Sequence, residues 1–174
     1  VRSQQYLSHQ KQLFAPDHIP VDVIIGPEQL VTDAIQQLIV NRGALQVLDF
    51  ADGRVQLVAV RAVHGGPIVG QQLSAIREHM PDVDTRVAAI FRKDRAIIPE
   101  GSTVVEADDE VFFIAARQHI RKVMAELRRV DKPYKRVMIA GGGNIGARLA
   151  KTLEKDYTIR IVERSQKRCR YLSE

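Results

Sequence analysis

A glycine-rich loop near the carboxyl end most restricts how this chain can fold. Gly141, Gly143 and Gly146 match the pattern G-x-G-x-x-G. The loop follows an apolar run, Arg136–Ala140, that is typical of a buried strand, and a helical pattern extends from Asn144 to Lys155. A strand, such a loop and a helix in this order begin a Rossmann-type unit. The sequence therefore predicts α/β structure at this end of the chain.

Each glycine of the loop has a separate expected role. Gly141 permits the tight turn from strand to helix, and Gly143 has no side chain, so a pyrophosphate can approach the backbone. Gly146 lets the helix pack closely on the strand. The first amide groups of the helix, at Asn144 and Ile145, would hold phosphates together with the positive end of the helix dipole.

A carboxylate completes the expected site. A second strand is predicted over Thr158–Val162, and Glu163 follows it, 22 residues after Gly141. A carboxylate here accepts hydrogen bonds from ribose hydroxyls and repels a 2′-phosphate, which favours NAD or an adenosine nucleotide over NADP. The neighbouring Arg164 would tolerate a phosphate. The predicted cofactor-binding residues are Gly141, Gly143, Asn144, Ile145, Gly146 and Glu163; the alternative is a Rossmann half retained only for packing.

The pattern of apolar runs and turns predicts a small, hairpin-rich α+β domain over residues 42–131. The turn Ala51-Asp52-Gly53-Arg54 separates two apolar runs, a strong hairpin signal. A closing helix is expected over Gln118–Arg129, with apolar residues on one face. Further strands are expected over Thr85–Arg92, Ala96–Ile98, Thr103–Glu106 and Glu110–Ala115. The fold class predicted for the whole chain is therefore mixed, α/β and α+β.

The first 41 residues contain the pattern of a helix over Ser3–Phe14, a strand over Val21–Ile25 and a helix over Pro27–Asn41. The last helix has apolar residues at i, i+4 spacing and is expected to be buried on one side. The chain begins at Val1 without an initiator Met and ends at Glu174, soon after the second strand of the α/β unit. We therefore expect an internal piece of a longer protein.

Composition narrows the function classes. No run approaches the roughly 18 apolar residues of a membrane span, no secretory signal is present, and a single cysteine, Cys169, fits a reducing compartment. We therefore expect a cytoplasmic protein. The net charge of +5 is concentrated in residues 132–174, with 11 basic and 4 acidic side chains. Without a recognisable nucleic-acid module, we interpret this as half of a larger domain.

Other candidate sites have simpler explanations. The five histidines have no metal-ligand spacing, and no Ser or Cys lies in a nucleophile motif. We therefore predict no metal site and no catalytic residue. An acidic cluster, Glu106, Asp108, Asp109 and Glu110, is expected to be a solvated turn rather than a cation site.

Four long segments carry a resemblance to a known family: Val21–Val31 (VDVIIGPEQLV), Ala44–Arg61 (ALQVLDFADGRVQLVAVR), Asp84–Ala116 and Arg136–Glu163 (RVMIAGGGNIG through RIVE). In these segments the chain resembles the tandem RCK family (regulator of potassium conductance, also called KTN) of bacterial potassium-uptake regulators. These proteins carry two RCK units in one polypeptide. The segments cover most of the chain and are far more specific than the glycine pattern.

The resemblance implies a layout and a function. Residues 1–41 would end a first nucleotide-binding lobe with its crossover helix, residues 42–131 would form the first RCK C-terminal domain, and residues 132–174 would begin a second nucleotide-binding lobe. The whole protein would bind NAD(H), ATP or ADP, form homo-oligomers at the inner face of the membrane without inserting into it, and bind no nucleic acid. It would not be an enzyme. Its partner would be a potassium-translocating membrane subunit of the TrkH or TrkG type.

Two other interpretations remain at this stage. One is a fragment of an NAD-dependent dehydrogenase, although the hairpin domain supplies no catalytic constellation for hydride transfer. The other is a module of a different transporter, in which residues 42–131 bind a small ligand or dimerise through exposed strand edges.

Overall fold

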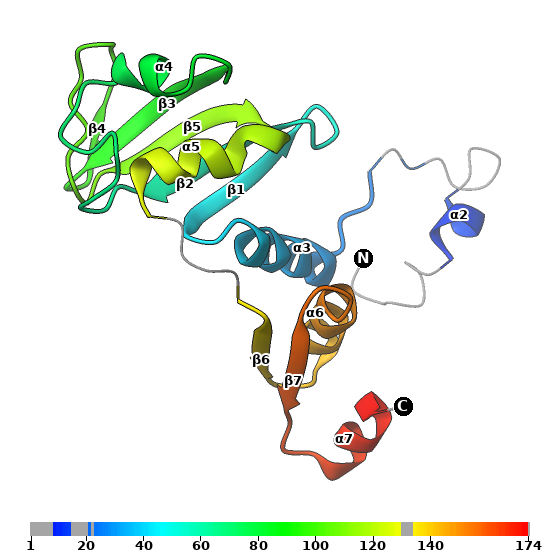
Figure 1. Cartoon of the computed structure of the whole chain (residues 1–174). Helices are drawn as coiled ribbons and strands as arrows, with labels where there is room; N and C mark the ends of the chain where they lie inside the picture. The colour runs from blue at the N-terminus through cyan, green and yellow to red at the C-terminus, as the bar shows by residue number, and fades with distance from the viewer. Residues whose placement is uncertain (1–8, 15–20, 22, 130–133, 174) are drawn as a thin grey trace. The chain divides into compact units, whose positions relative to one another are not determined.

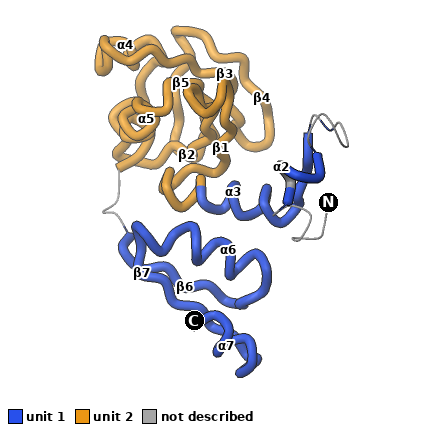
Figure 2. Tube along the Cα trace, turned by 90° about the vertical axis from the view of Figure 1, so that its right-hand side faces the viewer, with its two compact units in different colours: residues 1–36, 133–174 blue, residues 37–132 orange. Residues whose placement is uncertain are grey.

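The computed structural model describes residues 9–14, 21, 23–129 and 134–173 (Figure 1). The chain divides into two compact units (Figure 2). Unit 1 consists of residues 1–36 and 133–174, and unit 2 consists of residues 37–132. Unit 2 contains an antiparallel sheet and unit 1 contains a parallel one, so the prediction of a mixed fold class is confirmed.

Unit 2 is built on a five-stranded sheet in the order β1-β2-β5-β3-β4, and all of its neighbouring strands are antiparallel. The hairpin β1–β2 turns through Ala51, Asp52 and Gly53, which all have positive φ, and the hairpin β3–β4 turns through Lys93 and Asp94 in the same way. Strand β5 inserts between the two hairpins. The strands are β1 (Ala44–Phe50), β2 (Val55–Arg61), β3 (Thr85–Arg92), β4 (Arg95–Ile97) and β5 (Glu110–Ala116).

The core of unit 2 lies between one face of this sheet and helix α5 (Ile120–Leu127), which follows a 3-10 turn, η1 (Arg117–His119) (Figure 1). Alternate residues of β2 and β5 point into it because side chains alternate across a strand. The short helix α4 (Ala75–His79) adds Ile76. The apolar face predicted for the closing helix, Ile120, Val123, Met124 and Leu127, is fully buried, which confirms that prediction.

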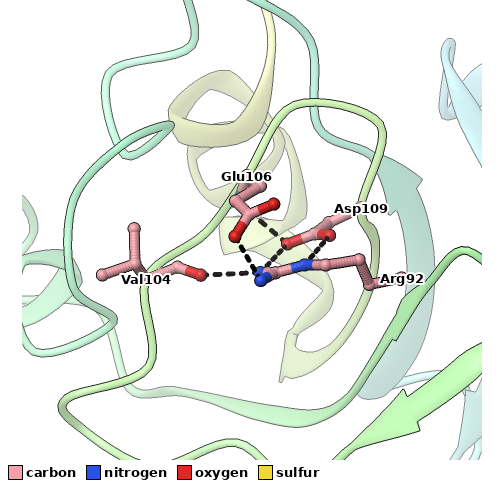
Figure 3. A network of polar contacts seen from close by, with 4 residues as sticks. All are labelled: Arg92, Val104, Glu106 and Asp109. Atoms are coloured by element: carbon pink, nitrogen blue, oxygen red, sulfur yellow. Dashed lines mark hydrogen bonds and ion pairs between the residues drawn. The ribbon is translucent and has the colours of Figure 1, made fainter.

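An ion-pair network around the buried Asp109 holds the chain between β4 and β5 (Figure 3). The Asp109 side chain is 0% exposed and accepts hydrogen bonds from Arg92 Nε and Nη2, both at 2.8 Å. Asp109 also accepts the Glu106 N–H, while Arg92 donates to the Val104 carbonyl and pairs with Glu106. The expected solvated turn is therefore wrong in part, because an arginine distant in sequence neutralises these carboxylates.

The beginning and the end of unit 2 lie next to each other. Helix α3 (Pro27–Val40) runs into β1 through Gly43, whose φ of +86° favours glycine. The Arg128 guanidinium, just after α5, donates from Nη1 to the Gly43 carbonyl at 3.3 Å. A methyl group on Gly43 would approach that guanidinium to 2.3 Å. The positive φ therefore favours glycine here, and any other residue would also displace the Arg128 guanidinium from the Gly43 carbonyl.

Unit 1 contains a two-stranded parallel sheet, β6 (Arg136–Ala140) and β7 (Thr158–Val162), connected by helix α6 (Asn144–Leu153). Both strands have the predicted bounds. Leu149 and Leu153 of α6 are buried. Helix α7 (Gln166–Ser173) follows β7, and α2 (Gln10–Leu13) is the described part of the helix expected over residues 3–14, since residues 3–8 lie outside the described chain.

Three local expectations differ from the structure. The described residues of Val21–Ile25 form no strand and belong to neither sheet of the described chain. A strand needs a neighbouring strand to share its backbone hydrogen bonds. Thr103–Glu106 makes only isolated bridges, at Val104 and Val105. The apolar stripe of α3 is largely exposed, with Leu30 at 56%, so burial of this face is not seen within the described chain. Among the described helices, none is long and apolar enough to cross a membrane.

We expect Arg92→Ala to lower the free energy of unfolding by about 3 kcal/mol, because it removes the cationic partner of a fully buried carboxylate. Arg61→Ala is the matched control: it breaks an ion pair with Glu110 in which both side chains are more than a third exposed. That pair is expected to contribute about 0.5 kcal/mol. Urea unfolding followed by circular dichroism measures both losses, and equal losses would contradict the assignment.

Candidate functional site

The glycine loop lies where the parallel strands of unit 1 end. Gly141 follows β6, and its N–H donates to the Val162 carbonyl at 2.8 Å, so the loop starts in register with the end of β7. Its φ of +104° is accessible to glycine and strained for other residues. The chain can therefore turn at once from β6 into α6.

Gly146 and Gly143 are needed for different reasons. A Cβ on Gly146 would lie 2.0 Å from the Gly141 carbonyl oxygen, so only a hydrogen allows α6 to approach the loop. A Cβ on Gly143 would meet no protein atom within 4 Å, and its φ of −67° suits any residue. The space beside Gly143 is therefore open, as expected for a backbone that a phosphate approaches.

The Glu163 carboxylate is fixed by the backbone around it. Its Oε2 accepts the Gly142 N–H and its Oε1 accepts the Ser165 N–H, both at 2.8 Å. Each carboxylate oxygen has a second lone-pair direction, so both oxygens can still accept a hydroxyl group. The structure thus brings Glu163 to the glycine loop, and its side chain is aligned before any ligand arrives.

These contacts also favour the charged form of Glu163. The Ser165 N–H and then the Gly142 N–H lower the pKa of Glu163 from its ordinary value, with smaller contributions from the Arg164 N–H and the Arg168 charge. Since folding lowers this pKa, ionised Glu163 stabilises the loop above its ordinary pKa. That contribution is lost as the pH falls through the lower folded value. The carboxylate is therefore ionised at neutral pH.

Two residues that the sequence pattern did not single out complete the loop. Gly142, a variable position of the motif, donates its N–H to Glu163, and its carbonyl accepts a hydrogen bond from Arg168 Nε at 2.8 Å. The Arg168 guanidinium also lies over the Tyr171 ring, 5.0 Å from its centroid. The sequence did offer one signal for this contact: Arg168 lies five residues after Glu163, on the helix that follows β7.

The remaining predicted residues lie at the start of α6. Asn144 is its first residue, and its Nδ2 donates to Glu28 Oε1 at 3.1 Å within unit 1. Ile145 follows and is partly exposed. Arg164, the residue expected to tolerate a phosphate, is exposed. All six predicted residues thus lie on one loop, one helix start and the end of the neighbouring strand.

Unit 2 contains a cleft of about 650 Å³ between α4, β3 and the turn after β4. Arg77 and Arg86 are among its lining residues, together with apolar side chains such as Ile76 and Val83. No group of three or more metal-ligating side chains occurs among the described residues. His79, the histidine closest to the cleft in sequence, instead lies 2.7 Å from Glu126 through its Nδ1.

In comparison with known proteins, a different domain model matches each of the two units. A TrkA-C domain matches residues 57–128 and a TrkA-N domain matches residues 137–174. The Trk system potassium uptake protein TrkA of Vibrio alginolyticus is 59% identical over the whole chain, and that of Halomonas elongata is 60% identical. The chain spans 38% of the length of each of these relatives.

A solved structure shows the same fold at much lower identity. The GsuK channel matches 95% of this chain, which corresponds to 29% of that chain, with a TM-score of 0.51 and 15% identity. The likeness extends over both units and supports the mixed α/β architecture.

Alanine substitutions at Gly146 and Gly143 distinguish a glycine that the packing requires from one that lies beside open space. We expect Gly146→Ala to destabilise unit 1 by about 2 kcal/mol, because the added methyl overlaps a backbone oxygen. Gly143→Ala should leave stability within about 0.5 kcal/mol of the parent, since its methyl meets no protein atom. Thermal unfolding followed by circular dichroism compares the two variants. A loss at Gly143 as large as that at Gly146 would contradict this geometry.

Proposed function

We propose that this chain, which matches TrkA-C and TrkA-N domains and is 59% and 60% identical to two TrkA potassium-uptake proteins, is part of a cytoplasmic, nucleotide-sensing regulatory subunit of a potassium-uptake transporter. The subunit forms homo-oligomers at the inner face of the membrane without inserting into it. It gates a potassium-translocating membrane subunit of the TrkH or TrkG type in response to NAD(H), ATP or ADP.

The observation that carries this proposal is the arrangement of the glycine loop around Glu163. Open space lies beside Gly143, and the ionised Glu163 carboxylate is held at the same loop by the Gly142 N–H. A dinucleotide or adenosine nucleotide would place its phosphates at Gly143 and the start of α6. Its ribose hydroxyls would donate to Glu163. The proposed cofactor-binding residues are Gly141, Gly143, Asn144, Ile145, Gly146 and Glu163.

Regulation follows from linkage between nucleotide and membrane partner. A nucleotide shifts an equilibrium between two assembly states only if it binds one state more tightly than the other. By reciprocity, the membrane subunit then changes nucleotide affinity by the same factor. In this scheme the nucleotide is an effector that is bound and released without being chemically changed. NADH oxidation or reduction of NAD by the full-length protein would overturn the proposal that it is not an enzyme.

We also propose the division of labour along the chain. Residues 1–41 end a first nucleotide-binding lobe with its crossover helix, residues 42–131 form the first TrkA-C domain, and residues 132–174 begin the second nucleotide-binding lobe. The antiparallel unit between the two lobes would then serve assembly or sensing.

A second candidate function rests on the cleft of unit 2. Arg77 and Arg86 line it together with Asp82, Asp84 and Glu100 and with apolar side chains, which suits a small ligand that carries charges of both signs on an apolar body. Titration of the Gly143→Ala protein with adenine nucleotides and cyclic dinucleotides tests it. Saturable binding that persists in this variant and is lost on further Arg77→Ala substitution would favour this function.

Nucleotide binding by the full-length protein is the central test. We expect calorimetry to detect binding of NADH and of ATP, and Gly143→Ala to weaken both by about tenfold or more, because its methyl occupies the space that a phosphate needs. Glu163→Gln should also weaken binding, because a neutral amide accepts ribose hydroxyls less strongly and has only one oxygen for the Gly142 and Ser165 N–H groups. Equal affinities of the parent and Gly143→Ala proteins would exclude the glycine loop as the site.

A further inference from the structure

Two side chains from outside the glycine loop bind its backbone: Glu163, which follows β7, and Arg168 of helix α7. The two peptide groups that flank the Gly142 Cα have separate anchors. The group before it donates its N–H to Glu163 Oε2, and the group after it accepts Arg168 Nε through the Gly142 carbonyl. Glycine restricts neither neighbouring torsion angle strongly. The orientation of the second peptide group therefore depends on Arg168.

That second peptide group carries the N–H of Gly143. A trans peptide is planar, and its C=O and N–H point in opposite directions. Because Arg168 holds the Gly142 carbonyl on the α7 side of the loop, the Gly143 N–H is directed away from α7. It is the backbone donor at the glycine beside which no protein atom would contact a Cβ within 4 Å.

Arg168 is itself held in place. Its guanidinium lies over the Tyr171 ring at 5.0 Å, and its backbone N–H approaches Ser165 Oγ at 3.3 Å at the start of α7. Ser165 in turn donates its N–H to Glu163 Oε1. The contacts therefore run from Glu163 through Gly142 to Arg168 and return through Ser165, so helix α7 and the loop are ordered together.

We propose that Arg168 is a positioning residue of the nucleotide site, which orients the Gly142–Gly143 peptide so that the Gly143 N–H faces the nucleotide phosphates. This role rests on the proposed nucleotide-binding function and adds a residue outside the glycine motif. Arg168 acts through the backbone, so its contribution depends on the phosphates of the ligand and not on its adenine or ribose.

Arg168→Ala in the full-length protein is expected to weaken ADP and NADH binding by about tenfold, because the peptide that carries the phosphate donor loses its orientation. Adenosine, which has no phosphate, should bind the variant and the parent alike. Arg168→Lys restores one donor and should recover part of the affinity. The matched control is Arg170→Ala, which removes a positive charge from an exposed residue of the same helix and should change neither affinity.

A double-mutant cycle distinguishes positioning from direct contact. If Arg168 acts through Gly143, the effect of Arg168→Ala should largely disappear in a Gly143→Ala background, where the phosphate no longer reaches that N–H. Additive losses would overturn the positioning role. So would an equal loss of adenosine affinity, or equal ADP affinities for Arg168→Ala and Arg170→Ala. Absence of any nucleotide binding by the parent protein would instead refute the proposed function itself.

Discussion

The contact between Gly146 and the Gly141 carbonyl is the constraint on which unit 1 depends. A Cβ at Gly146 would lie 2.0 Å from that oxygen, so the absence of a side chain sets how closely α6 approaches the end of β6. This approach allows α6 to begin directly after Gly143 while the loop stays beside the end of β7, where the Gly141 N–H donates to the Val162 carbonyl. Glu163 can then reach the Gly142 N–H at 2.8 Å. One missing methyl group thus brings the open space beside Gly143 and the Glu163 carboxylate to the same loop.

The glycine loop and its flanking strands could be predicted from the sequence because their signals are local. Strand β6, the loop and strand β7 are adjacent in sequence, and each glycine has a stereochemical requirement that the motif states directly. The closing helix α5 was equally predictable, since its apolar residues repeat at helical spacing. The family resemblance extended this prediction to the order of the domains.

Three of the misjudged or overlooked features concern partners distant in sequence. Asp109 was expected to be solvated, yet Arg92, 17 residues away, pairs with it in the interior. Arg168 was overlooked because its partner is a backbone carbonyl 26 residues earlier, and side-chain patterns do not report backbone acceptors. Val21–Ile25 has the composition of a strand, but composition cannot supply the neighbouring strand that its hydrogen bonds require. Local propensity therefore described the elements better than the polar contacts that join them.

The hydrogen bond between Arg128 and Gly43 brings the entry and exit of unit 2 together. A domain whose ends are adjacent occupies little more than a loop in the chain that carries it, because its insertion does not force the flanking segments apart. Unit 2 therefore has the geometry of a domain that can be duplicated or exchanged between proteins without rebuilding the segments on either side of it. This junction depends on the Arg128 guanidinium and on the backbone conformation of Gly43.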